Sequence, residues 1–103
     1  MEKIVEEIRA LLIGQGVPVF GIAESTLMEN EAQNYRCSDI LASAKSFLCV
    51  GMPFPKGVFY AKQRTNETYW RAANIYYRNI DMILLRIARM IEEKGEVAAP
   101  VFG

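Results

Sequence analysis

One long helical pattern dominates this chain and limits how it can fold. It begins at Thr65, which is a suitable N-cap with Glu67 in the first turn, and it ends at Lys94 before Gly95. At 1.5 Å per residue, such a helix is about 45 Å long. Since the whole sequence has 103 residues, we expect the remaining elements to cover only part of this helix.

Apolar residues lie on two sides of the predicted helix. The main row recurs at spacings of three and four, which predicts a buried face. The opposite side is charged but is interrupted by Ile75, Met82 and Leu85, and we predict that these three residues mediate self-association, either with a second copy or with a missing C-terminal domain. The main row comprises Tyr69, Ala73, Tyr76, Ile80, Ile83, Ile87 and Met90, flanked by Trp70, Tyr77, Leu84 and Ile91.

The side chains on this helix admit functional interpretations as well. Its aromatic residues suit core packing or a subunit contact better than the wall of a flat-cofactor pocket. Its arginines suit an anion-binding stripe less well than an ordinary charged face, since acidic residues lie nearby on the same helix. The arginines in question are Arg71, Arg78, Arg86 and Arg89.

The other predicted elements are short. The apolar stripe from Ile4 to Leu12 predicts a helix that ends near Gly14 and Gly16. Residues 17–23 and 46–52 are predicted to form buried strands, and residues 97–102 a third strand at an edge because of Pro100. The sequence thus predicts a single α/β (or α+β) domain over 1–103 with a small mixed or parallel sheet.

Composition excludes several kinds of chemistry. The absence of histidine removes the usual zinc ligand and the usual general base, and the formal net charge of zero gives no nucleic-acid signature. Cys37 and Cys49 are too few for a metal site. Cys49 lies in an apolar run, which favours a buried hydrophobe over a redox pair. We predict no catalytic residue, no metal ligand, no membrane segment and a cytoplasmic location.

A basic loop after the second strand is the candidate binding site. In open α/β sheets, ligands bind beyond the carboxyl ends of strands. The loop over residues 52–64 could therefore contact a phosphate, a nucleotide tail or a corrinoid side chain, and the alternative is a solvated loop that closes the sheet. The predicted cofactor-binding residues are Lys56, Tyr60, Lys62 and Arg64.

The order and spacing of these pieces resemble a known family. The features that carry the similarity are a strand with Gly-Ile-Ala, a leucine turn, an Ala-Lys-Ser strand entry, a Pro-rich turn and a Tyr-rich long helix. In this sequence they are Gly16 with Val19-Phe20-Gly21-Ile22-Ala23, then Asp39-Ile40-Leu41, Ala44-Lys45-Ser46 and Glu92-Glu93-Lys94-Gly95. The chain resembles the N-terminal region of the iron–sulfur cluster-binding reductases related to epoxyqueuosine reductase, whose relatives include the corrinoid-dependent reductive dehalogenases.

The resemblance implies a nitroreductase-like or cobalamin-binding domain. In full-length relatives such a domain precedes a ferredoxin-type segment that binds a 4Fe-4S cluster, and cobalamin is the cofactor of the corrinoid-dependent branch. We therefore expect the N-terminal scaffold portion of an oxidoreductase that is not catalytic in isolation. The rival expectations are a small dimeric binding or assembly module without redox activity, and a ligand-binding fragment for a phosphate-bearing or tetrapyrrole-like molecule.

Overall fold

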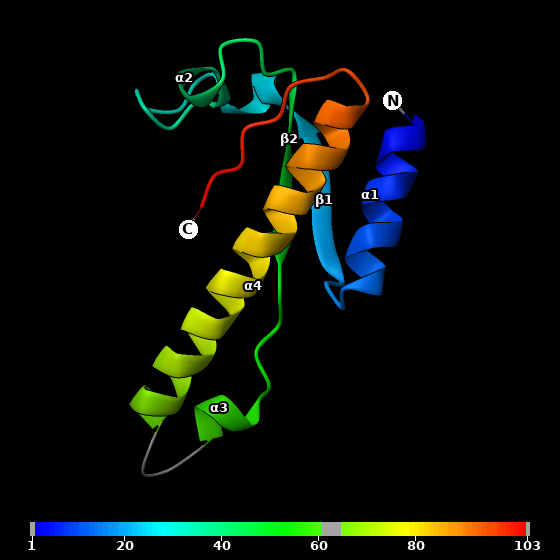
Figure 1. The fold of residues 1–103 in the computed structure, drawn as a ribbon. Coiled ribbons are helices and arrows are strands. Elements are labelled where there is room, and N and C mark those ends of the chain that lie inside the picture. Colours follow the sequence, from blue (N-terminus) through cyan, green and yellow to red (C-terminus); the bar gives the residue numbers. More distant parts are fainter. Residues whose placement is uncertain (1, 61–64, 103) are drawn as a thin grey trace. The chain divides into compact units, whose positions relative to one another are not determined.

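The computed structural model describes residues 2–60 and 65–102 (Figure 1). The chain divides into two compact units: a helical unit of Met1–Pro18 with Gly51–Gly103, and a ribbon unit of Val19–Val50. Its elements in chain order are α1 (Glu2–Gly14), β1 (Val19–Glu24), the 3₁₀ helix η1 (Ser25–Met28), α2 (Cys37–Ile40), β2 (Ser46–Gly51), α3 (Gly57–Tyr60) and α4 (Thr65–Glu93).

Helix α1 ends in a glycine motif that also builds the core. Gly16 has a φ of 75°, in the left-handed region that glycine adopts without a steric penalty. Its N–H donates to the carbonyl of Ile13 at 3.1 Å, and the Val17 N–H donates to the carbonyl of Leu12 at 2.9 Å. This is the Schellman arrangement, in which the residues at the two ends of the longer bond make an apolar contact. Both Leu12 and Val17 are fully buried.

Helices α1 and α4 pack together and contain most of the core (Figure 1). Ile8 and Leu12 of α1 and Ile83 and Ile87 of α4 are buried, each at 4% exposure or less. The prediction of a helix over residues 65–94 that ends at Gly95 is confirmed, and Gly95 has a φ of 91°. Thr65, the predicted N-cap, has a side chain that lies outside the described part of the chain.

The N-terminal half of α4 packs against α3 through aromatic rings. Phe54 is the centre of this cluster, with its ring stacked 5.2 Å from Tyr69 and tilted 5.3 Å from Tyr76. Phe59 makes an edge contact with Phe54 at 5.8 Å. Trp70 and Tyr77, which the sequence placed beside the buried row, are instead 67% and 56% exposed.

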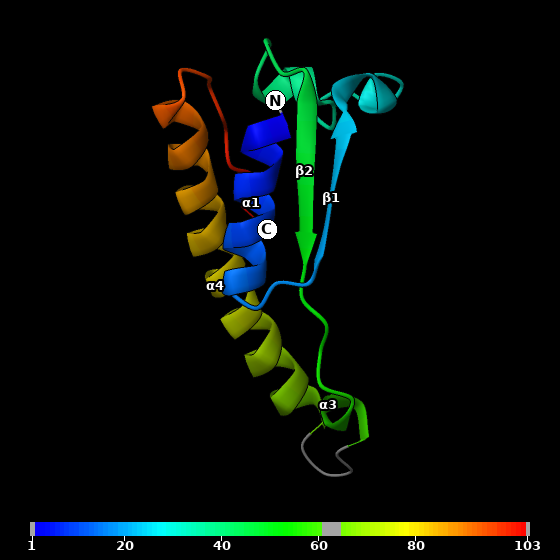
Figure 2. The ribbon, with the colours of Figure 1, turned by 90° about the vertical axis from the view of Figure 1, so that its right-hand side faces the viewer.

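The ribbon unit is built on a two-stranded antiparallel sheet of β1 and β2, whose arrows point in opposite directions in Figure 2. The sequence favoured parallel strands, and this expectation is wrong. Parallel strands need a crossover that returns along the sheet. Here the connection contains only η1, turns and the single turn α2, and it brings the chain back at the same end of the ribbon. Ser25 closes that end, since its N–H donates to the carbonyl of Lys45 at 2.9 Å.

Three further expectations about strands are corrected. No residue of β1 or β2 is buried, because a pair of strands leaves its side chains largely uncovered. Cys49 is accordingly exposed and is not a core residue. Residues 97–102 form no strand. Pro100 cannot donate a ladder hydrogen bond, and the segment instead lies near α4, where Phe102 and Met82 line one hollow.

Candidate functional site

The most distinctive surface of the helical unit is the outer face of α4, opposite its packed side. Three apolar side chains stand exposed there: Ile75 at 65%, Met82 at 55% and Leu85 at 48%. They lie on one stripe because residues separated by three, four or seven positions share a helix face. These are the residues for which the sequence predicts self-association, and that role stays a prediction.

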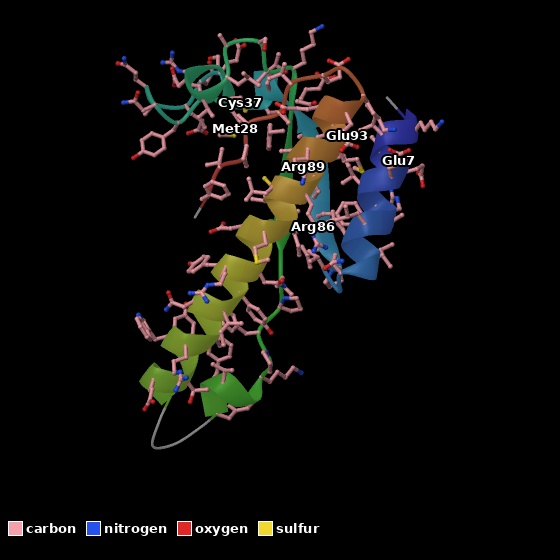
Figure 3. All side chains as sticks on the ribbon, viewed as in Figure 1. Glu7, Met28, Cys37, Arg86, Arg89 and Glu93 are labelled. Atoms are coloured by element: carbon pink, nitrogen blue, oxygen red, sulfur yellow. The ribbon has the colours of Figure 1, made fainter. Side chains whose placement is uncertain are left out.

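Arginines alternate with these apolar residues along the same stripe. Arg71, Arg78 and Arg89 are exposed, and Arg89 is seen on α4 in Figure 3. Among the described residues, none of these three guanidinium groups has a hydrogen-bond or ion-pair partner. With Glu92, these residues occupy seven positions that are spaced alternately by four and three, which is the spacing of a coiled-coil seam. We call this row the α4 seam; it comprises Arg71, Ile75, Arg78, Met82, Leu85, Arg89 and Glu92.

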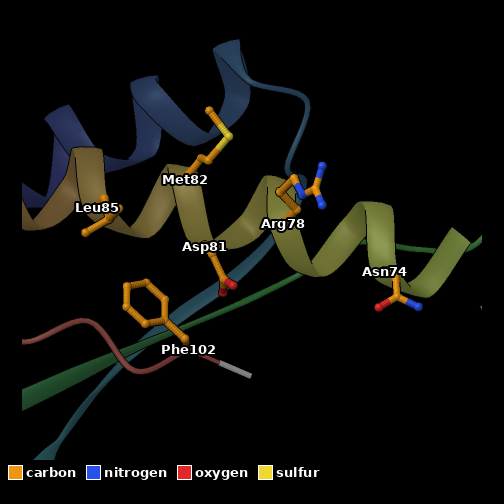
Figure 4. A pocket seen from close by; sticks show the side chains of 6 residues that line it. All are labelled: Asn74, Arg78, Asp81, Met82, Leu85 and Phe102. Atoms are coloured by element: carbon orange, nitrogen blue, oxygen red, sulfur yellow. The ribbon is translucent and has the colours of Figure 1, made fainter. Parts of the chain in front are cut away.

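Two open hollows lie along the seam. The larger, of about 380 Å³, lies between α4 and the C-terminal segment, and Figure 4 shows Asp81 pointing toward the segment that bears Phe102. The smaller, of about 310 Å³, lies nearer the start of α4. Asn74 and Arg78 line both. Both hollows thus combine an apolar wall with the Arg78 guanidinium group and the Asn74 amide, and the Asp81 carboxylate adds a negative charge to the larger one.

The predicted cofactor-binding residues are only partly described. Lys56 and Tyr60 are exposed, with Tyr60 at 74%. Lys62 and Arg64 lie outside the described residues. The segment expected to be a loop contains the helical turn α3, and the ring of Phe59 is engaged with Phe54 and Tyr69. Binding of a cofactor by this segment stays a prediction.

The cysteines and acidic residues do not assemble into a metal centre in the described ranges. Cys37 and Cys49 are both free thiols, and no three His, Cys, Asp or Glu side chains within residues 2–60 and 65–102 gather closely enough to hold a metal ion. Cys37 lies on α2 and Met28 on η1, two short helices that pack together (Figure 3).

Comparison of the chain with protein-family models, with curated proteins and with solved structures gives no match. In the described parts of the chain, every helix is too short or too polar to cross a bilayer.

Sequence reasoning found the three apolar residues of the seam but missed their surroundings. It did not identify the hollow, because Phe102 was assigned to a strand and because Asn74 has no distinctive pattern of its own. One signal was available in the sequence. The arginines and the apolar residues continue a single four-three spacing, which marks them as one surface.

Proposed function

We propose that this chain is a non-catalytic scaffold region of an iron–sulfur oxidoreductase of the epoxyqueuosine reductase-like class, which works by docking through the α4 seam. The observation that carries the docking role is the exposure of Ile75, Met82 and Leu85 along a regularly spaced stripe. Scattered exposed apolar residues are ordinary, but apolar residues that recur along one stripe beside polar groups are typical of an interaction surface.

The class of enzyme rests on the resemblance, which extends over nearly the whole sequence. The finer fold that belongs to this proposal is part of a nitroreductase-like or cobalamin-binding domain. The antiparallel ribbon is compatible with it, since the outer edge of each strand has backbone groups that a further strand could pair with. A 4Fe-4S cluster or cobalamin would then belong to other parts of the assembly.

Turnover and cofactor titration test the scaffold role. In one assay the purified chain is mixed with reduced methyl viologen alone. In a separate assay without viologen it is titrated with hydroxocobalamin or flavin mononucleotide, and absorbance spectra are recorded against protein-free blanks. We expect neither viologen oxidation nor a difference spectrum. A stoichiometric spectral change with either cofactor would support the ligand-binding alternative and would contradict a purely structural role, as would sustained turnover.

A dimeric assembly module is the second candidate, and the coiled-coil spacing of the seam favours it. Sedimentation equilibrium of the wild-type chain and of Met82→Asp separates the two. A wild-type dimer that the substitution dissociates would support the dimeric module. A monomer in both cases would support docking to a different protein surface.

A further inference from the structure

The charge of the α4 seam indicates what kind of partner covers it. The seam carries three arginines against one glutamate, Glu92. On its flanks the charges are mixed, with Arg86 on one side and Asp81 and Glu93 nearby. The positive excess therefore lies in the row that a partner helix would touch, where charge complementarity decides partner choice.

A second copy of the chain fits this row poorly in a parallel pair. Parallel, in-register helices place each seam residue against its own copy. Met82 would then meet Met82 favourably, but Arg71, Arg78 and Arg89 would each meet an identical arginine. Like charges brought together at an interface oppose association.

Antiparallel pairing of two copies also brings arginines of the seam together. In an antiparallel pair the numbers of two facing residues have a constant sum. The register that sets Met82 against Leu85 also sets Arg78 against Arg89. The register that sets Ile75 against Leu85 sets Arg71 against Arg89. Both of these registers, which join apolar residues of the seam, therefore also join two cations.

From this we infer that the α4 seam binds an acidic amphipathic helix on the surface of another protein. The inference rests on the proposed docking function and adds the chemistry of the partner. Apolar side chains of that helix cover Ile75, Met82 and Leu85. Its carboxylates pair with the guanidinium groups of Arg78 and Arg89, which have no partner among the described residues.

An anionic membrane is the competing surface for a basic amphipathic helix. The seam is less suited to it, because Asp81, Glu92 and Glu93 lie along the same side of α4 as the arginines and would face the lipid headgroups. Carboxylates near an anionic surface offset the attraction that arginines provide. A folded helix with a few acidic side chains can avoid them, whereas a uniform lipid surface cannot.

Binding of two matched synthetic helices tests the inference. The probe has three heptads with leucine at the core positions and glutamate at the flanking positions, and the control peptide has lysine in place of every glutamate. Fluorescence anisotropy of the labelled peptides against the full chain is the measurement. We expect the acidic peptide to bind at least about tenfold more tightly, with the difference shrinking in high salt.

Paired variants locate the effect. Arg78→Glu combined with Arg89→Glu is expected to reverse the preference between the two peptides. Lys3→Glu combined with Lys45→Glu changes the net charge equally at exposed residues that are not part of α4, and it is expected to leave the preference in place. An equal loss in both double variants would overturn the inference, because the attraction would then come from net charge alone.

A third variant separates this inference from the docking function. If Met82→Asp weakens both peptides and peptide charge makes no difference, the docking role stands and the acidic partner is rejected. If neither peptide binds and Met82→Asp changes nothing, the docking role fails as well. Binding to vesicles of phosphatidylserine and phosphatidylcholine in place of the acidic peptide would assign the seam to membranes and overturn the inference. Circular dichroism confirms that each variant keeps its helices.

Discussion

The helical unit and the ribbon unit hold their structure in different ways. Every buried apolar residue in the described ranges belongs to the helical unit, whereas no residue of Val19–Val50 is buried. A helix can bury a whole stripe against one neighbouring helix. A strand pair exposes both of its faces unless a further layer covers it. The comparison teaches that apolar composition alone does not make a core, because the partner element must also be present.

Truncation of a core leucine tests this comparison most severely. Leu12→Ala is expected to lower the free energy of unfolding by about 2–5 kcal/mol, since it removes a fully buried side chain and leaves a cavity. Leu48→Ala in half-buried β2 is the matched change and is expected to cost less than about 1 kcal/mol. Urea denaturation followed by ellipticity at 222 nm measures both. Equal costs would break the comparison.

A substitution in the turn after α1 tests the comparison between the two units further, because this turn places Val17 in the core of the helical unit. Gly16→Ala forces a side chain into the left-handed region and is expected to destabilise the fold by about 1–2 kcal/mol. Gly14→Ala is the control. It lies within α1, where an added Cβ meets nothing within 4 Å, and it is expected to stabilise by roughly 0.5–1 kcal/mol. Thermal unfolding should shift in opposite directions, and a shared direction would show that the turn is not selective for glycine.

Hydrogen bonds, and not burial, should hold the end of the ribbon unit. The Ser25 hydroxyl donates to the carbonyl of Ala44 at 3.0 Å. Ser25→Ala is expected to cost about 0.5–1.5 kcal/mol and to speed amide hydrogen exchange within residues 19–50. Ser46→Ala, at an exposed position of β2, should leave the exchange rates close to those of the wild type. Unchanged exchange in both variants would contradict this account.

Surface ion pairs should add little to the stability of the helical unit. Lys94 Nζ lies 2.9 Å from Glu7 Oε2, with about a third of each side chain exposed. Glu7→Gln is therefore expected to cost only about 0.2–1 kcal/mol, and less at high salt. Glu6→Gln, whose partner Arg9 is 3.8 Å away, is the weaker control. A cost from Glu7→Gln comparable to that from Leu12→Ala would mean that packing is not what distinguishes the two units.

Local sequence signals predicted the two long helices well, but not the helical turn α3, which lies in a segment predicted to be a loop. The start and end of α4, the glycine stop of α1 and the short turn at α2 all depend on neighbouring residues, through apolar spacing and through caps. The position of the strands was also visible, since β1 and β2 fall within the predicted ranges to within one or two residues. The relative direction of the two strands and the exposure of their side chains were not predicted, because both depend on which elements lie beside the strands.

The candidate site likewise has features that neighbouring residues determine and features that depend on tertiary packing. The spacing of Ile75, Met82 and Leu85 is enough to place them on one face of a helix. That Phe102 lies near this face, with Asp81 and Arg78 at the edge of the hollow, depends on how the C-terminal segment returns along α4.

By itself, the amino-acid sequence determined where the two long helices lie and which of their residues share a face, because those properties arise from interactions within a few residues. Only the tertiary structure decided that the strands run antiparallel, that Cys49 is exposed and that residues 97–102 pair with no strand. Burial and strand pairing join residues far apart in the chain, and no local pattern specifies which of several apolar surfaces will meet.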